Sequence, residues 1–387
     1  MITLKLIVRN ALRHRLRTLL TTLAITISVL AFSILRTMVS AWYSGVDLSS
    51  PSRLVTRSAV SLGFSLPVSY QKQISLIKGV RLVSYANWFG GIYINERNFF
   101  ANWAVDPERY FEFYPEYVLP PDQFTAFLRE RKACIAGRKL CNKYGWKIGD
   151  TIVLKGTVFP GYWEFVLRGI YRGRDRTTDE KQFFFHWDYR YEKLKTREPH
   201  RASQVGLFLI GLTDRDLAAE VSSEIDRTFR NSPAETITET EKVFQMNFVN
   251  MTGSALLLIQ LVSFVVLMSM AMVIANTMAM SVRERKAEYA VLKTIGFGGG
   301  YIMLLVLGES LCMSLTGYAF GVALSFPAVG LIADTLGVYF PSFSMNGQTL
   351  AVAFVVTCSV GLVSPILPAF RAVAGTVADG LRTEGDR

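Results

Sequence analysis

The stretch Ser281-Val-Arg-Glu-Arg-Lys-Ala-Glu-Tyr-Ala-Val-Leu-Lys-Thr-Ile-Gly296 is rich in charge and lies between two long apolar runs. Residues 253–280 before it carry no charged side chain, and residues 300–330 after it carry only Glu309. Each run is longer than the roughly 20 residues that a helix needs to cross the hydrocarbon core of a bilayer. The sequence therefore predicts two membrane-spanning helices joined by a short polar segment, residues 281–299.

Two further apolar runs, 18–42 and 349–370, bring the predicted spans to four. Half of the residues are apolar and 19% are charged, which is typical of membrane proteins that also carry a soluble part. Residues 43–252, between the first and second spans, are numerous enough for a domain with its own core. We predict an α-helical membrane protein with four transmembrane helices and an α+β extracytoplasmic domain between helices 1 and 2.

The local patterns inside residues 43–252 support the α+β prediction. Residues 134–137 read as a strand, 138–144 as a helix and 145–150 as a turn. Later segments show the same alternation of strand and helix patterns. We predict strands at 151–154, 163–169 and 205–210, and a helix at 214–230.

The basic residues beside the spans predict the orientation. The first 17 residues hold five bases and no acid, and segment 281–299 holds four bases, whereas the loop 331–348 holds none. By the positive-inside rule, both termini and segment 281–299 are cytoplasmic and the domain and the loop 331–348 lie outside. Residues 1–17 further predict a basic amphipathic helix that anchors the first span on the inner leaflet or docks a cytoplasmic subunit. The tail 371–387 is predicted to be cytoplasmic.

Composition and motifs argue against several functions. The net charge is +11, but much of the basicity lies beside the spans, so we do not expect nucleic-acid binding. Neither a phosphate-binding GxxxxGK[ST] loop nor a GxSxG nucleophile motif occurs. His14, His186 and His200 are scattered along the chain. We therefore predict no catalytic residue, no metal site and no cofactor in this chain.

The cysteines divide between the two predicted regions. Cys134 and Cys141 fall in the outer domain, where their spacing permits a disulfide in an oxidising compartment but does not predict one. Cys312 and Cys358 fall in spans and are expected to pack as small apolar side chains.

Two other features have both a structural and a functional interpretation. Aromatic residues are dense in 85–117 and 162–191, and they predict either a buried core or an exposed partner surface. Glu309 lies roughly 13 Å into the third span. Because a carboxylate inside a membrane is costly, we expect a polar contact between helices there, with a proton relay as the alternative.

One resemblance is specific. The stretch Asn276-Thr-Met-Ala-Met-Ser-Val-Arg-Glu-Arg-Lys-Ala-Glu-Tyr-Ala-Val-Leu-Lys-Thr-Ile-Gly296, followed by Glu309-Ser-Leu and Gly317, resembles the hallmark of permeases of the MacB, LolC and FtsX type of ABC systems. In that family an asparagine precedes V-x-E-R-x-x-E-[IY]-x-x-L-[KR]-x-[IL]-G, and an apolar run with E-[SG] follows. Residues 9–20 and 137–150 are also similar to the family.

The resemblance implies a permease subunit in the bacterial inner membrane that lacks a fused ATPase domain, unlike MacB. It would pair with a second permease copy, as a homodimer or a heterodimer, and with two copies of a separate ABC ATPase subunit that bind ATP and Mg²⁺. Segment 281–299 would be the coupling element in a groove of the ATPase. By this analogy the ATPase-coupling residues are Arg283, Glu284, Arg285, Glu288, Leu292 and Lys293.

The resemblance also implies a function. We expect an exporter permease in which ATP hydrolysis by the partner moves the outer domain and drives export or extraction of cargo, as mechanotransmission. The alternative is a transmembrane signal transducer that activates an extracytoplasmic cell-wall hydrolase without transport, and a third is a receptor or scaffold independent of ATP. A periplasmic adaptor, an outer-membrane partner and the cargo are left open.

Overall fold

The structure, a computed structural model, describes Ile7, Arg9 and residues 13–50, 52–175, 178–336 and 343–375. Most of the predicted amphipathic helix 1–17 and of the predicted tail 371–387 lies outside the described residues, as does part of the loop 331–348.

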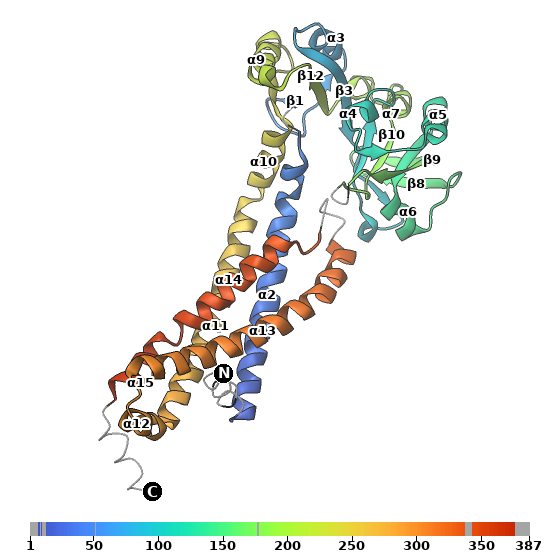
Figure 1. The fold of residues 1–387 in the computed structure, drawn as a ribbon. Helices are drawn as coiled ribbons and strands as arrows, with labels where there is room; N and C mark the ends of the chain where they lie inside the picture. The colour runs from blue at the N-terminus through green and yellow to red at the C-terminus, as the bar shows by residue number, and fades with distance from the viewer. Residues whose placement is uncertain are drawn as a thin grey trace. The chain divides into compact units, whose positions relative to one another are not determined.

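The chain forms two compact units (Figure 1). The membrane unit comprises Met1–Ser40, Gly253–Ala333 and Phe343–Arg387. The second unit, here called the outer domain after its predicted location, comprises Ala41–Thr252 and Asp334–Ser342.

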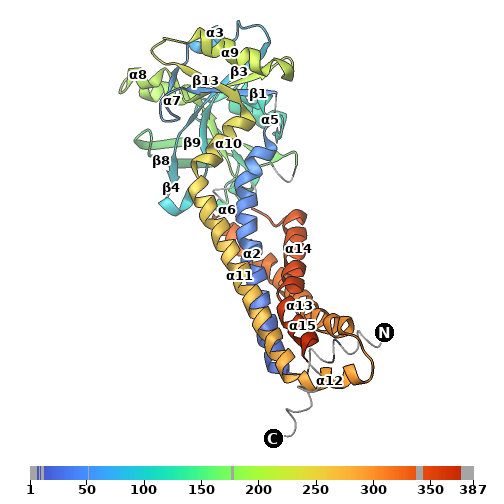
Figure 2. The same cartoon turned by 90° about the vertical axis from the view of Figure 1, so that its left-hand side faces the viewer.

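Four helical spans are long and apolar enough to cross a membrane, which confirms the predicted number of transmembrane helices. Figure 2 shows that the first and second run side by side. The second continues to Glu284, four residues past the predicted end of that span. The fourth is interrupted before Pro365, since proline has no N–H to continue the helical ladder. The helices are α2 (Arg15–Leu48), α11 (Gly253–Glu284), α13 (Gly299–Leu336), and α14 (Gly347–Val363) followed by α15 (Ile366–Ala374).

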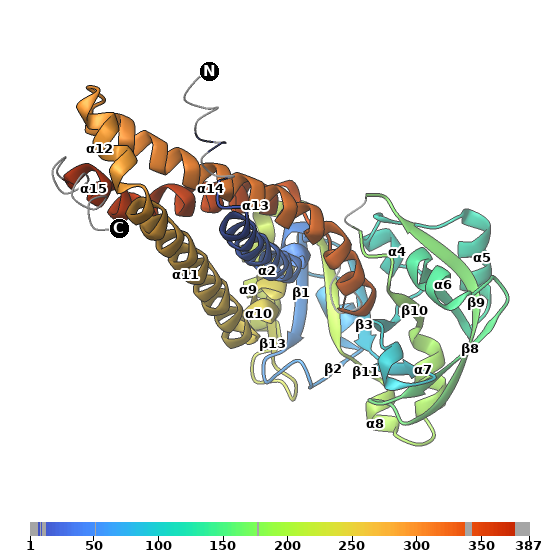
Figure 3. The same cartoon turned by 90° about the horizontal axis from the view of Figure 1, so that it is seen from below.

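Small residues bring α2 and α13 together, and Figure 3 shows the two helices next to each other. Gly317 and Gly321 lie one turn apart on α13 and face Ile25 and Val29 of α2. The absence of a side chain allows close backbone approach, as in other Gly-xxx-Gly contacts between membrane helices. Thr26 Oγ1 donates a hydrogen bond to the Gly317 carbonyl at 3.4 Å in the same contact.

In the described residues, the outer domain is built on an eleven-stranded mixed sheet. Ten of the strands follow the order β13-β1-β12-β3-β5-β10-β7-β9-β8-β4, and the eleventh, β6, pairs with β9. β10 is parallel to β5, and β7 is parallel to β9. The strands are β1 (Arg53–Ser58), β3 (Val80–Trp88), β4 (Gly91–Tyr93), β5 (Asn102–Val105), β6 (Tyr117–Val118), β7 (Ala133–Gly137), β8 (Thr151–Gly156), β9 (Gly161–Gly173), β10 (Phe183–His186), β12 (Leu207–Leu212) and β13 (Thr236–Thr240).

Helices complete the outer domain, and the predicted α+β class is confirmed. The predicted helix 214–230 is a short 3₁₀ turn, Arg215–Leu217, followed by α9. A two-stranded sheet pairs β2 (Leu66–Pro67) with β11 (Gln204–Val205). The helices are α3 (Tyr70–Ile74), α4 (Tyr110–Phe113), α5 (Pro121–Arg129), α6 (Arg138–Tyr144), α7 (Trp187–Leu194), α8 (Pro199–Ala202), α9 (Ala218–Thr228) and α10 (Glu241–Met251), with a further 3₁₀ turn at Glu96–Asn98.

Strand β10 illustrates how the aromatic residues of the outer domain pack. Phe183 and Phe185 belong to the hydrophobic core on one face of the sheet, and Phe184 belongs to the core on the other. Successive side chains of a strand point to opposite faces, so this strand is buried on both sides. All three rings are fully buried, which favours the core interpretation of the aromatic run.

The two cysteines of the outer domain are free thiols. Cys134 on β7 and Cys141 on α6 are both buried in the core. Burial raises the pKa of both thiols, so they are expected to be unreactive.

The contact between α2 and α13 predicts the effect of one added methyl group. In Gly317→Ala the new Cβ would lie 2.4 Å from Ile25 Cγ2, so the helices must shift apart. We expect a loss of about 1–3 kcal/mol of stability, measured by thermal unfolding in detergent. Gly330 on the same helix has no described atom within 4 Å of the corresponding position, so Gly330→Ala is the matched control and should be neutral. Equal losses in the two variants would contradict this packing.

Candidate functional site

The charged segment between the second and third spans forms a helix of its own. α11 ends at Glu284, Arg285 leaves helical geometry, and α12 (Lys286–Thr294) follows. The left-handed conformation of Gly296, with φ of +98°, terminates α12. The Phe297 N–H then donates to the Leu292 carbonyl at 3.0 Å, which satisfies an end carbonyl of the helix.

A buried ion pair fastens this segment to the third span. Arg285 Nη1 lies 3.0 Å from Glu309 Oε2, and their side chains are only 8% and 4% exposed. Arg285 Nε also donates to Glu288 Oε2 at 3.0 Å, and Ser281 Oγ donates to the other Glu309 oxygen at 3.4 Å. Glu309 therefore makes polar contacts with Ser281 of α11 and with Arg285.

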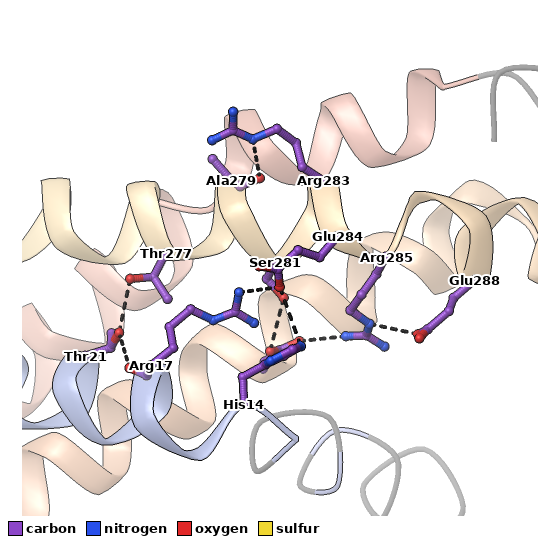
Figure 4. A network of polar contacts seen from close by, with 11 residues as sticks. His14, Arg17, Thr21, Thr277, Ala279, Ser281, Arg283, Glu284, Arg285 and Glu288 are labelled. Carbon is purple, nitrogen blue, oxygen red and sulfur yellow. Dashed lines mark hydrogen bonds and ion pairs between the residues drawn. The ribbon is translucent and has the colours of Figure 1, made fainter. Parts of the chain in front are cut away.

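Bases from the start of the first span hold the same segment from another side. Arg17 Nη1 donates to Glu284 Oε2 at 2.5 Å, and His14 Nε2 lies 3.5 Å from that oxygen. Figure 4 shows both side chains directed toward Glu284. Arg13 forms an ion pair with Glu288. The two glutamates, which stand four residues apart and would repel each other in an isolated helix, are therefore each paired with a base from the N-terminal region.

Two pKa values outside the spans reflect this network. For Arg285, burial lowers the pKa, but Tyr289, Glu288 and Glu309 outweigh burial and hold the pKa above its ordinary value. For Glu288, burial raises the pKa, but the hydrogen bonds from Arg285 and Arg13 together outweigh burial. The pKa of Glu288 therefore lies below its ordinary value of 4.5. The network therefore favours the charged form of both groups.

The remaining residues predicted to contact an ATPase have mixed environments. Lys293 Nζ donates to the carbonyls of Val373 and Gly375 at 2.7 and 2.6 Å, where it satisfies the C-terminal end of α15. Leu292 is half-buried against the core of the membrane unit. Arg283 is exposed, and Figure 4 shows it on the side of α11 away from Arg17.

Exposed apolar side chains on this segment were missed as site residues by the sequence-based prediction. Val291, Ile295 and Phe297 are 46%, 69% and 41% exposed. Val282 and Tyr289 in the same stretch of sequence are buried. The spacing of Val291 and Ile295, four residues apart among charged residues, was the available signal.

These features define a multi-pass membrane protein whose inter-span segment is part of its helix bundle. Residues 260–377 match the family described as FtsX-like permease C-terminal. The resemblance to permeases of the MacB, LolC and FtsX type is thus confirmed: the chain contains an FtsX-like permease domain and is similar to ABC transporter permeases.

Three relatives illustrate this similarity. An uncharacterized ABC transporter permease protein of Mycobacterium tuberculosis is 22% identical over 67% of this chain and 30% of its own length. The macrolide export ATP-binding/permease protein MacB of Rhodopseudomonas palustris is 26% identical over 44% of this chain and 26% of its own length. An uncharacterized ABC transporter permease of Methanocaldococcus jannaschii is 22% identical over 93% of this chain and 92% of its own. The chain thus spans less than a third of the first two relatives.

Among solved structures, the periplasmic region of MacB from Actinobacillus actinomycetemcomitans aligns with a TM-score of 0.38 and 9% identity. The alignment covers 51% of this chain and 93% of that one.

The buried ion pair predicts a double-mutant result. Glu309→Gln leaves the buried Arg285 charge without its closest intramembrane partner, and we expect a loss on the order of 3 kcal/mol. In Arg285→Met with Glu309→Leu both buried charges are gone, so the double variant should be more stable than Glu309→Gln alone. Thermal unfolding in detergent measures both, and a double variant that loses more than the single would refute an ion pair.

The lowered pKa of Glu288 predicts a pH dependence. A depressed folded pKa contributes stability above the unfolded pKa, near 4.5, and that contribution is lost as the pH falls through the folded value. Wild-type chain should therefore exceed Glu288→Gln in stability at pH 7, and the difference should shrink as the pH falls below 4.5. Glu220→Gln, at an exposed carboxylate on α9, is the control. A stability difference between wild type and Glu288→Gln that grows as the pH falls would contradict a lowered pKa for Glu288.

Proposed function

We propose that this chain is the membrane subunit of an ABC exporter. In this proposal a separate ATPase binds at α12, and ATP hydrolysis there moves the outer domain and exports or extracts a cargo. The FtsX-like permease domain and the relatives named as ABC transporter permeases support the class. The name of the relative MacB joins ATP binding and permease in one protein, which supports coupling to ATP.

The observation that carries the proposal is that polar and apolar residues within 284–297 have different environments. The polar residues Glu284, Arg285 and Glu288 are engaged within the chain, whereas Val291 and Ile295 are exposed. Burying a side chain of this size against a partner yields about 1.5–3 kcal/mol. A short helix with exposed apolar residues suits a hydrophobic groove on a soluble subunit. We therefore propose that the ATPase contacts the apolar residues.

The polar contacts would then transmit force. Arg285 joins α12 to α13 through Glu309, and Arg13 joins α12 to the start of α2 through Glu288. Glu284, at the end of α11, is joined to Arg17 of α2. A displacement of α12 by the ATPase would therefore act on three spans at once, because breaking a buried ion pair is costly.

The remaining parts of the proposal rest on the positive-inside rule for the topology and on the resemblance to the family for the partners. Segment 281–299 and both termini would lie in the cytoplasm of a bacterium, and residues 43–252 on the outer side of its inner membrane. Two ATPase copies would bind ATP and Mg²⁺, and a second permease copy would complete the complex. A periplasmic adaptor or an outer-membrane partner would receive the cargo.

The proposed contact predicts the effect of one substitution. The full chain, purified by affinity tag in mild detergent, should retain a P-loop ATPase and show ATP hydrolysis. Ile295→Asp places a charge at the apolar contact and should reduce the retained ATPase roughly tenfold or more. Leu76→Asp, at a residue 79% exposed on the outer domain, is the matched control and should retain the ATPase.

Two results would count against the proposal. If no ATPase is retained by the wild-type chain, a stand-alone receptor or scaffold is favoured. If an ATPase is retained together with a cell-wall hydrolase, and hydrolase activity but no cargo movement depends on ATP, the chain is a signal transducer.

A further inference from the structure

A cavity of about 560 Å³ lies among the end of α11, α12 and the end of α15. Four bases line it, and part of its wall is apolar. The bases are Arg283, Lys286, Lys293 and Arg371, and the apolar wall includes Ala279 and Val282.

Among the residues that the structure describes, the lining of the cavity holds four bases and no carboxylate. Lys286 and Arg371 are exposed and have no ion pair among the described residues. The acids of this segment are engaged elsewhere, since Glu284 pairs with Arg17 and Glu288 pairs with Arg13 and Arg285. Lys286 and Arg371 therefore lack a counter-charge among the described residues, and a bound anion would supply one.

The lining also contains a buried aromatic residue. Tyr289 lines the cavity and is 2% exposed, yet its hydroxyl has no hydrogen-bond partner in the part of the chain that the structure describes. Buried hydroxyl groups are rarely left unpaired, because the lost hydrogen bond to water is not replaced.

The position of the cavity indicates which class of anion would bind in it. The span that contains α11 ends at Glu284, and the span that contains α15 ends at Ala374. The cavity therefore lies where two transmembrane helices leave the bilayer, at the level of lipid headgroups. Basic pockets between membrane helices on the cytoplasmic side bind anionic headgroups. An apolar wall beside the bases suits an amphiphile better than an acidic peptide.

We propose that this cavity binds the phosphate headgroup of an anionic phospholipid. The lipid would bridge α12 and α15 and would hold the inter-span segment against the bilayer. This inference goes beyond the proposed function and does not depend on an ATPase.

The experiment uses the full chain in neutral detergent, titrated with phosphatidylglycerol and observed by native mass spectrometry. Each base close to an anionic lipid strengthens binding roughly fivefold. Lys286→Gln with Arg371→Gln should therefore weaken phosphatidylglycerol binding about 25-fold, since both bases are exposed and unpaired among described residues. Lys72→Gln with Lys147→Gln removes two exposed bases of the outer domain and should bind as wild type.

The controls separate the sources of the anion. Inorganic phosphate at millimolar concentration should neither bind nor displace the lipid, and phosphatidylcholine should bind weakly to every variant. Equal loss in the two double variants would reduce the effect to general surface charge and overturn the proposal. Displacement by inorganic phosphate would assign the cavity to a free anion instead. Unchanged lipid binding in Lys286→Gln with Arg371→Gln, together with loss of a co-purifying ATPase, would make the cavity a protein contact.

Discussion

Arg285 and Glu309 constrain each other because two charges in a low-dielectric interior need to stay together. Their side chains meet at 3.0 Å and are almost fully buried, so α12 cannot leave α13 without exposing both charges to an apolar surrounding. The helix break after Glu284 positions Arg285 for this contact, with Glu288 one turn further on. The charged segment between the second and third spans is consequently an integral part of the membrane bundle.

This constraint assigns different tasks to neighbouring residues. Side chains that face the N-terminal bases or Glu309 stabilise the bundle, and Lys293 satisfies the end of α15. Side chains that face outward, Val291 and Ile295, are available to a partner. A third face presents bases to a cavity at the ends of two spans. One short segment can thus join a soluble partner, the membrane helices and the lipid.

The outer domain is organised by a different principle. Strand β10 is covered on both faces, since Phe183 and Phe185 belong to one core and Phe184 to the other, whereas β8 alternates buried and exposed residues. The aromatic residues that are dense in this part of the sequence largely serve its two cores.

Properties of contiguous residues could be predicted from the sequence. The four spans follow from apolar runs, the α+β class from strand and helix patterns, and the permease resemblance from the charged segment around Glu288. The sequence alone did not reveal the partners of the charges. Arg17 and Glu284 are 267 residues apart, and Arg285 and Glu309 are 24 apart on different helices. Helix packing alone brings them together, since which charge is buried and which is exposed depends on the rotation of each helix against its neighbours.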